Sequence, residues 1–204
     1  MNTAILNKRG IVKRIISIAA AIIIVALAFG SAVSGDEKRL PVYYVDTAEK
    51  QVAISFDAAW GNEYTAGILD ILDTYDVKAT FFLVDFWAKK YPDDVKMIHE
   101  KGHDIGNHSA THPDMADLSA EQIKNEISSV ADTVERITGK RTVLFRPPYG
   151  SYNNRLIECA EELEHTVIQW DVERCETAEN VGIHNKIVFF SQLQRDIISV
   201  SMFN

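Results

Sequence analysis

Short apolar runs, each followed by polar residues, recur along most of the chain and predict a series of β-strands. In residues 51–57 the apolar side chains fall on every second position, which predicts a strand that ends at Asp57. The continuous run KATFFLV, residues 78–84, is typical of a strand buried on both faces. The runs HDIGNHS (103–109), TVLFR (142–146) and HTVIQWD (165–171) predict three more strands.

Segments with helical periodicity separate these strands. Apolar residues three and four positions apart predict helices over residues 65–75, 92–102, 119–138 and 154–164. The third helix is the clearest, because Ser119 and Gln122 form a capping box at its start and Gly139 follows its last turn. Strands that alternate with helices predict an α/β fold with a parallel sheet, either open or closed into a barrel.

The N-terminus carries a different pattern. Basic residues between Lys8 and Arg14 precede an uncharged apolar run over residues 15–33, which is long enough to span a bilayer. This pattern is typical of a secretory signal peptide or of a membrane anchor, and the sequence leaves both open. We therefore expect residues 1–34 to direct export, residues 35–48 to form a linker and residues 49–204 to form one extracytoplasmic domain, either membrane-anchored or secreted to the cell envelope.

Composition narrows the function without identifying it. The chain has 204 residues, enough for one substantial core and too few for two. Its formal net charge of −8 argues against a nucleic-acid partner, which needs a basic face. Two cysteines, Cys159 and Cys175, do not make a disulfide framework, and Cys159 lies in a helical pattern where a buried thiol is expected.

Polar residues of the kinds used in active sites gather at the ends of the predicted strands, where ligands bind in parallel α/β folds. His108 and His112, in GNHSATHPDM, are four residues apart on a predicted loop, so two neutral imidazoles can converge on one divalent cation. The pair alone is weak evidence, because histidines at this spacing are also common on surfaces and at helix caps. The other candidates at or after strand ends are Asp57, Arg146, Tyr149 and Asp171.

Three motifs carry a family resemblance. SFDAAWG around Asp57, NHSATH around the two histidines and RPPYG from Arg146 onward resemble, in this order, the motifs of the NodB-like polysaccharide deacetylases, carbohydrate esterase family four. The similarity covers residues 45–171, and SFDAAWG, LFRPPYG and IQWDV are most similar to the sporulation-type branch. The resemblance implies a distorted (β/α) barrel. It also implies hydrolytic removal of N-acetyl groups from an N-acetylhexosamine polymer such as peptidoglycan.

The resemblance further implies a role for each motif residue. Asp57 stands at the position of the catalytic base, and His108 and His112 stand at metal-ligand positions. The expected ion is Zn²⁺, with Co²⁺ or another divalent ion as the alternatives. Arg146 matches the arginine that orients the base through an ion pair, and Tyr149 matches the residue whose backbone N–H holds the oxyanion. We expect the cell-wall glycan to contact Trp60, Pro147, Trp170 and Asp171.

Two departures from the family pattern bear on activity. Ala58 stands where the family usually has a second aspartate as a metal ligand, and alanine cannot bind a metal. The nearby Asp104 and Asp114 are expected to be solvated loop carboxylates. After residue 171 the chain is atypical, because Ser191 stands where a catalytic acid histidine is expected and His184 precedes the last apolar run. We therefore expect the barrel to be incomplete at its C-terminal end.

Three functions remain open at this point. The first is a metal-dependent deacetylase that acts on a cell-wall glycan and associates with the membrane through its N-terminal segment. The second is a catalytically impaired glycan-binding protein of the cell wall on the same fold, which Ala58 and Ser191 favour. The third is an unrelated metal-dependent hydrolase on an α/β scaffold, which the order of the three motifs disfavours.

Overall fold

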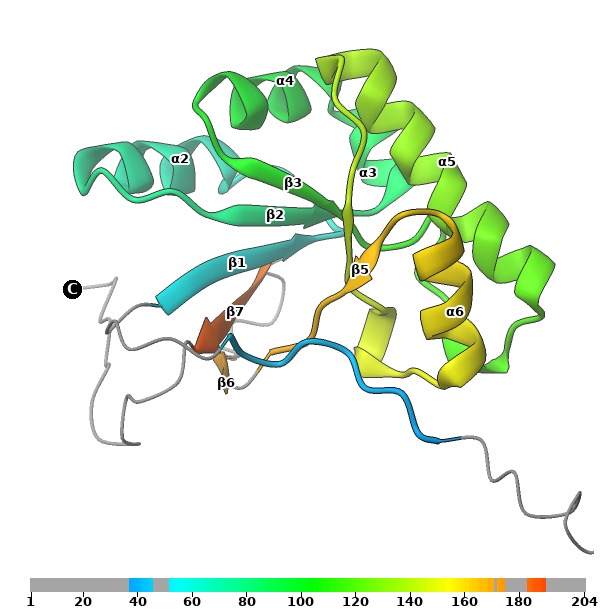
Figure 1. Cartoon of the computed structure of the whole chain (residues 1–204). Coiled ribbons are helices and arrows are strands. Elements are labelled where there is room, and N and C mark those ends of the chain that lie inside the picture. Colours follow the sequence, from blue (N-terminus) through cyan, green and yellow to red (C-terminus); the bar gives the residue numbers. More distant parts are fainter. Residues whose placement is uncertain (1–36, 46–51, 171, 175–182, 190–204) are drawn as a thin grey trace, which may run out of the picture. The chain divides into compact units, whose positions relative to one another are not determined.

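A computed structural model describes residues 37–45, 52–170, 172–174 and 183–189 (Figure 1). The chain divides into two compact units, residues 1–38 and 39–204, and the fold described below is that of the second unit. The predicted export segment, residues 1–34, lies outside the described residues. Within the described part of the chain, no helix combines the length and the apolar character needed to cross a bilayer.

Five parallel strands form the main part of the sheet. They are β1 (Val52–Ala58), β2 (Thr80–Leu83), β3 (Asp104–Asn107), β4 (Leu144–Phe145) and β5 (Thr166–Val167), each near a run that the sequence predicts as a strand. The complete order is β5-β4-β3-β2-β1-β7-β6, so the parallel strands lie side by side in the order of the chain. In a doubly wound fold the order in which strands are added reverses within the sheet, whereas in a barrel each new strand lies next to the preceding one. The order therefore confirms the barrel-type α/β class.

The last two strands differ from the expected pattern. β6 (Val172–Arg174) and β7 (Ile183–Phe189) are antiparallel to each other, and β7 is antiparallel to β1. The connection between β6 and β7 is shorter than the roughly dozen residues that a parallel crossover requires, so the chain turns back. His184 precedes the apolar run, as the sequence shows, but β7 begins before that run, so His184 is its second residue and pairs in register with Asp57 of β1.

The helices follow the strands in the predicted order, with one addition. They are α2 (Thr65–Thr74), α3 (Asp85–Lys90), α4 (Pro92–Glu100), α5 (Ala120–Thr138) and α6 (Asn154–Glu162), with short 3₁₀ turns at Met115–Asp117 and Pro148–Gly150. The hydrophobic pattern does not predict α3, because six residues are too few to display a helical period. Helices α4 and α5 both contact β3 and each other, which places them in one layer over the sheet (Figure 1).

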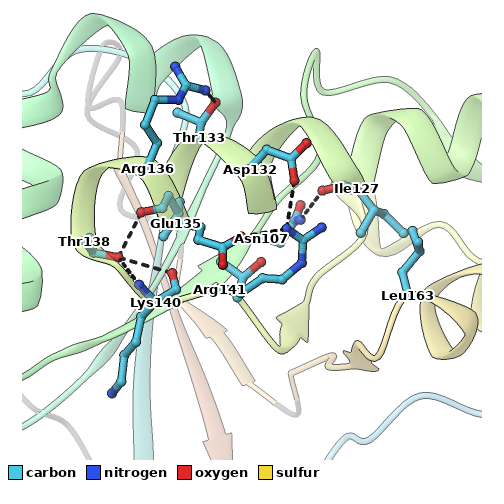
Figure 2. A network of polar contacts seen from close by, with 12 residues as sticks. Asn107, Ile127, Asp132, Thr133, Glu135, Arg136, Thr138, Lys140, Arg141 and Leu163 are labelled. Atoms are coloured by element: carbon cyan, nitrogen blue, oxygen red, sulfur yellow. Dashed lines mark hydrogen bonds and ion pairs between the residues drawn. The ribbon is translucent and has the colours of Figure 1, made fainter.

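Helix α5 is fixed at both ends by the predicted caps. Ser119 and Gln122 make the reciprocal hydrogen bonds of a capping box, and Gly139 ends the helix with a φ of 74°, which a glycine adopts without strain. Arg141, which follows the C-terminal end of α5, forms ion pairs with Asp132 and Glu135 of that helix (Figure 2). These contacts hold both ends of α5 in place, so the loops that pack on α5 rest against an ordered helix.

Two clusters of buried apolar residues make up the core. The first joins β1 and β2 to helices α2, α3 and α4, and the second joins α5 and α6 to β4 and β5. Cys159 of α6 belongs to the second cluster and is buried as predicted, whereas Cys175 lies outside the described residues. The large side chains that are fully buried include Trp87, Phe56, Phe81, Phe82 and Phe145.

Part of the predicted linker packs against the sheet. Val42 N–H donates to the Val167 carbonyl, and the Val42 carbonyl accepts from Gln169 N–H, both at 2.8 Å, which forms a parallel bridge beside β5. The hydroxyl of Tyr43 donates to that of Tyr152 (3.2 Å), and this contact raises the pKa of Tyr43 to about 12. Val42 thus pairs with backbone groups at a strand edge that would otherwise be exposed.

Two buried histidines are held in their neutral form. His103 Nδ1 accepts from Ala79 N–H (3.3 Å), and His165 Nδ1 donates to the Leu163 carbonyl (2.7 Å) while its Nε2 accepts from Thr142 Oγ1 (2.9 Å). Both side chains are buried, and burial is the main cause that lowers the pKa of each imidazole.

We predict that the domain loses stability as the pH falls below about 6.5, the pKa of a histidine in an unfolded chain. A folded-state pKa below the unfolded value means that the unfolded chain binds more protons in this range, so acid favours unfolding. Each of the two histidines adds at most ~1.4 kcal/mol per pH unit. Urea unfolding at pH 7.5 and pH 5.5 measures the effect. His103→Leu should flatten the profile, and a wild-type profile that is already flat would contradict the prediction.

Candidate functional site

The candidate residues come together at the carboxyl ends of three parallel strands. Asp57 is the penultimate residue of β1, His108 directly follows β3, and Arg146 directly follows β4. All three side chains are buried, with exposed fractions of 3%, 2% and 0% respectively. The arrangement confirms the general expectation that strand-end residues share one edge of the sheet.

A buried ion pair connects the first and fourth strands. Arg146 Nη1 donates to Asp57 Oδ1 at 2.7 Å, and Nη2 donates to the Ser55 hydroxyl at 2.9 Å. The guanidinium also lies over the Phe82 ring, with Cζ 4.0 Å from the ring centroid. The arginine therefore holds the Asp57 carboxylate in one orientation and favours its charged form.

His108 completes this buried group. Its Nδ1 donates to the Arg146 carbonyl (2.7 Å), because a carbonyl can only accept, and this assigns the lone pair to Nε2. Nε2 lies 3.6 Å from Asp57 Oδ2. The backbone of Arg146 therefore fixes the tautomer of the histidine while its side chain fixes the aspartate.

The loop from His108 to His112 folds so that the imidazole of His112 contacts that of His108. The two ring centroids are 5.0 Å apart and the rings meet edge to face. Ser109 and His112 both have positive φ angles, 70° and 60°, a conformation that costs a non-glycine residue on the order of 1–3 kcal/mol. The Ser109 hydroxyl accepts from His112 N–H (3.0 Å), which offsets part of this strain.

Exposed aromatic side chains surround His112. Its ring centroid is 4.8 Å from that of Tyr149 and 6.0 Å from that of Trp60, and Phe86 lies 5.3 Å beyond Trp60. Tyr149 is 70% exposed and Trp60 is 55% exposed. Flat apolar rings at the mouth of a polar site suit the apolar faces of a sugar.

The RPPYG turn is rigid and packs against the chain after β5. Pro147 and Pro148 are buried, so Pro147 supports the turn from within. Tyr149 has a φ of 58°, and Gly150, at 65°, leaves room for Trp170, whose ring a Cβ at this position would approach to 2.9 Å. Trp170 in turn lies 5.7 Å from the Arg146 guanidinium. Asp171, the remaining candidate, lies outside the described residues.

His108 and His112 fit a divalent ion as a partial ligand set. Their donor type suits Zn²⁺ or Co²⁺, and the hydrogen bond to Arg146 orients His108 as ligating histidines usually are. Ala58 is 1% exposed and offers only a methyl group. Asp114 caps a 3₁₀ turn, as expected for a loop carboxylate, whereas Asp104 is exposed but is the first residue of β3 and not part of a loop. Among the described residues, no three His, Cys, Asp or Glu side chains group together to hold a metal ion.

The family assignment rests on a sequence match that spans the whole of this site. The profile of the polysaccharide deacetylase family matches residues 44–168. The chain belongs to the polysaccharide deacetylase family. The match includes β1 to β5 and every candidate residue except Trp170 and Asp171.

Several curated relatives of this chain are named as bacterial peptidoglycan deacetylases. The peptidoglycan-N-acetylmuramic acid deacetylase PdaA of Bacillus subtilis (strain 168) is 36% identical over 137 residues, which are 67% of this chain and 52% of that protein. An uncharacterised 30.6 kDa protein of Geobacillus stearothermophilus is 40% identical over 131 residues, 64% of this chain and 49% of that protein. The chain thus spans about half the length of these relatives.

Solved structures of the polysaccharide deacetylase family include both active and inactive members. A pseudoenzyme of carbohydrate esterase family four from Bacillus anthracis superposes with a TM-score of 0.63 at 37% identity, over 65% of this chain and 47% of that one. PdaA of Bacillus subtilis gives a TM-score of 0.62 at 35% identity, over 65% and 57%. These likenesses confirm the (β/α) barrel-type fold.

The residues that sequence reasoning missed are those that support the motif residues. Ser55 lies two positions before Asp57 on the same strand face, a period-two relation that could have singled it out. Asn107 donates from Nδ2 to the Ile127 carbonyl of α5 (2.7 Å) and accepts from Ser109 N–H (3.0 Å), which ties the histidine loop to that helix (Figure 2).

We predict that Arg146→Met lowers the free energy of unfolding by about 3–5 kcal/mol, because it leaves the buried Asp57 carboxylate without its counter-ion. The double variant Arg146→Met/Asp57→Asn should recover part of this loss, since a neutral amide needs no counter-ion. Urea unfolding provides the measurement. Arg136→Met, at an exposed position of α5, is the matched control and should change stability by no more than about 0.5 kcal/mol. A single-variant loss below about 1 kcal/mol contradicts a charged, buried pair.

Proposed function

We propose that this protein removes N-acetyl groups from a cell-wall glycan of the peptidoglycan type, by hydrolysis at a divalent metal site. The buried Asp57–Arg146 pair beside His108 and His112 carries the proposal. A protein that only binds sugar has no use for a carboxylate fixed by a fully buried arginine next to two metal-type histidines. The family membership and the names of the curated relatives support the same reaction.

Each side chain then has a task in the reaction. A divalent ion held by His108 and His112 would supply Lewis-acid polarisation of the acetyl carbonyl. Asp57 takes the proton of the attacking water, and Arg146 keeps that carboxylate ionised and aimed. When the C–N bond of the amide then breaks, the leaving amine takes its proton from water, because Ser191 stands where the family has its acid histidine. The backbone N–H of Tyr149 donates to the oxyanion that develops on the carbonyl, and Trp60 stacks against the sugar.

A specific observation favours a second candidate, a glycan-binding protein without catalysis. Ala58 removes a carboxylate ligand, and the pseudoenzyme from Bacillus anthracis has the same fold. A variant of that pseudoenzyme with restored enzymatic activity is 38% identical to this chain over 65% of its length, with a TM-score of 0.63. Enzymatic activity can therefore be absent from a member of this family and be restored by mutation.

The place of action follows from the substrate. Peptidoglycan lies outside the cytoplasmic membrane, so we propose that the domain acts in the cell envelope. The basic and apolar N-terminal sequence, residues 1–34, would export it as a cleaved signal or retain it as a membrane anchor.

We predict that the chain, supplied with Zn²⁺ or Co²⁺, releases acetate from peptidoglycan or from N-acetylglucosamine oligomers. Asp57→Asn removes the base and should lower the rate about 100-fold or more, and His108→Ala should abolish metal-dependent release. Asp104→Asn, at an exposed carboxylate, is the control and should keep the wild-type rate. No acetate release with any metal, together with retained binding to peptidoglycan, establishes the non-catalytic alternative.

We also predict that Ala58→Asp raises the affinity for Co²⁺ by roughly tenfold or more, because it restores the carboxylate ligand that the family usually has at this position. Titration followed by Co²⁺ absorbance measures the affinity, and acetate release measures the rate. Ala59→Asp adds the same charge one residue further on and is the matched control. An equal gain in both variants would mean that the added charge acts without specific ligation.

A further inference from the structure

The loop that carries the two histidines needs support from outside itself. Its conformation includes positive φ angles at Ser109 and at His112, which are uncommon for residues other than glycine. Ala110 and Thr111 lie between them and belong to no strand or helix. A segment of this kind keeps a single conformation only if neighbouring groups hold it.

Glu126 of α5 provides such support with a single carboxylate. Its Oε2 accepts from the backbone N–H groups of Ala110 and Thr111, both at 2.8 Å. Its Oε1 accepts from the Thr111 hydroxyl at 2.8 Å. Three donors on one carboxylate are charge-assisted hydrogen bonds, and together they define both the position and the tilt of the loop.

The next residue of the helix holds the start of the loop. The Ile127 carbonyl accepts from Asn107 Nδ2, and Asn107 Oδ1 accepts from Ser109 N–H. Glu126 and Ile127 of α5 therefore hold the loop by hydrogen bonds to residues on both sides of Ser109, the first residue with a positive φ. Helix α5 is capped at both ends and is therefore rigid, so these hydrogen bonds fix the position of the loop relative to a rigid helix.

We infer that Glu126 is a positioning residue that holds the loop from Ser109 to His112 in the conformation that brings the two imidazoles together. The inference rests on the proposed function, since it assigns the loop its metal-binding purpose. Glu126 lies outside the three family motifs, in a helix where a glutamate would otherwise be a solvated side chain. Its three contacts all go to the histidine loop.

The test compares Glu126→Ala, Glu126→Gln and Glu121→Ala in the full chain, solubilised in detergent and labelled with ¹³C in its histidine rings. The glutamine oxygen can accept both backbone N–H groups while its amide donates to the Thr111 hydroxyl, so Glu126→Gln should keep the loop in place. Glu121 is an exposed residue of the first turn of α5 and serves as the matched control. The readouts are the His112 ring resonance without metal, hydrogen exchange over residues 110–111, and Co²⁺ affinity.

We expect Glu126→Ala to shift the His112 resonance, to speed exchange over residues 110–111 and to weaken Co²⁺ binding about 10- to 100-fold. The remote His103 and His165 resonances should not move, which separates loop release from unfolding. If Glu126→Ala does not fold, Glu126→Asp, shorter by one methylene group, provides the same comparison.

Two results overturn the inference. The first is an unchanged His112 resonance together with Co²⁺ affinity within about twofold of wild type. The second is a Glu126→Gln variant as impaired as Glu126→Ala, which would assign the effect to charge and not to the hydrogen bonds. A wild-type chain that releases no acetate contradicts the proposed function, and the metal-free resonance and exchange data still decide the role of Glu126.

Discussion

The buried ion pair between Asp57 and Arg146 is the constraint on which the rest of the site depends. It joins β1 to β4, across the two strands that lie between them, and its arginine has no exposed surface. Removing such charges from water costs several kcal/mol per ion, which only close pairing and further hydrogen bonds offset. The Ser55 hydroxyl and the Phe82 ring supply these additional contacts. An apolar pair of the same volume would suit stability as well, so the pair points to a chemical use.

The same arginine also sets the geometry of its neighbours through its backbone. Its N–H donates to the Asn107 carbonyl (2.9 Å), which aligns the end of β4 with the end of β3. Its own carbonyl accepts from His108 and turns the opposite ring nitrogen toward Asp57. The two prolines that follow limit the conformations of this backbone, so the turn reaches its shape before any ligand binds. A single residue thus coordinates the base, the first metal-type histidine and the turn that carries Tyr149.

The sequence predicts those parts of the structure that depend on residues a few positions apart in the chain. Alternation of apolar residues predicts β1, and the pair Ser119 and Gln122 predicts the start of α5, because each pattern acts within a few residues. The direction of β7 depends on the length of the connection before it and on which strand edge remains available. Glu126 meets the histidine loop only after α5 has packed on β3, so no motif spacing indicates it. Contacts made through tertiary packing are therefore the ones that required the structure.

Charge balance explains why retention of the metal decides between the two candidate functions. Asp57 and Arg146 cancel each other's charge, and His108 and His112 add none in the neutral form that binds a metal, so the four side chains then carry no net charge. The second aspartate of the usual family motif would give a divalent ion a carboxylate that is not paired with Arg146. Ala58 provides no such ligand. An ion that enters this site must then draw on Asp57, in competition with Arg146, or rely on the two imidazoles. The base and the two histidines are in place, so the chemistry depends on the affinity of this reduced site for a cation and on a source of the proton that Ser191 does not replace.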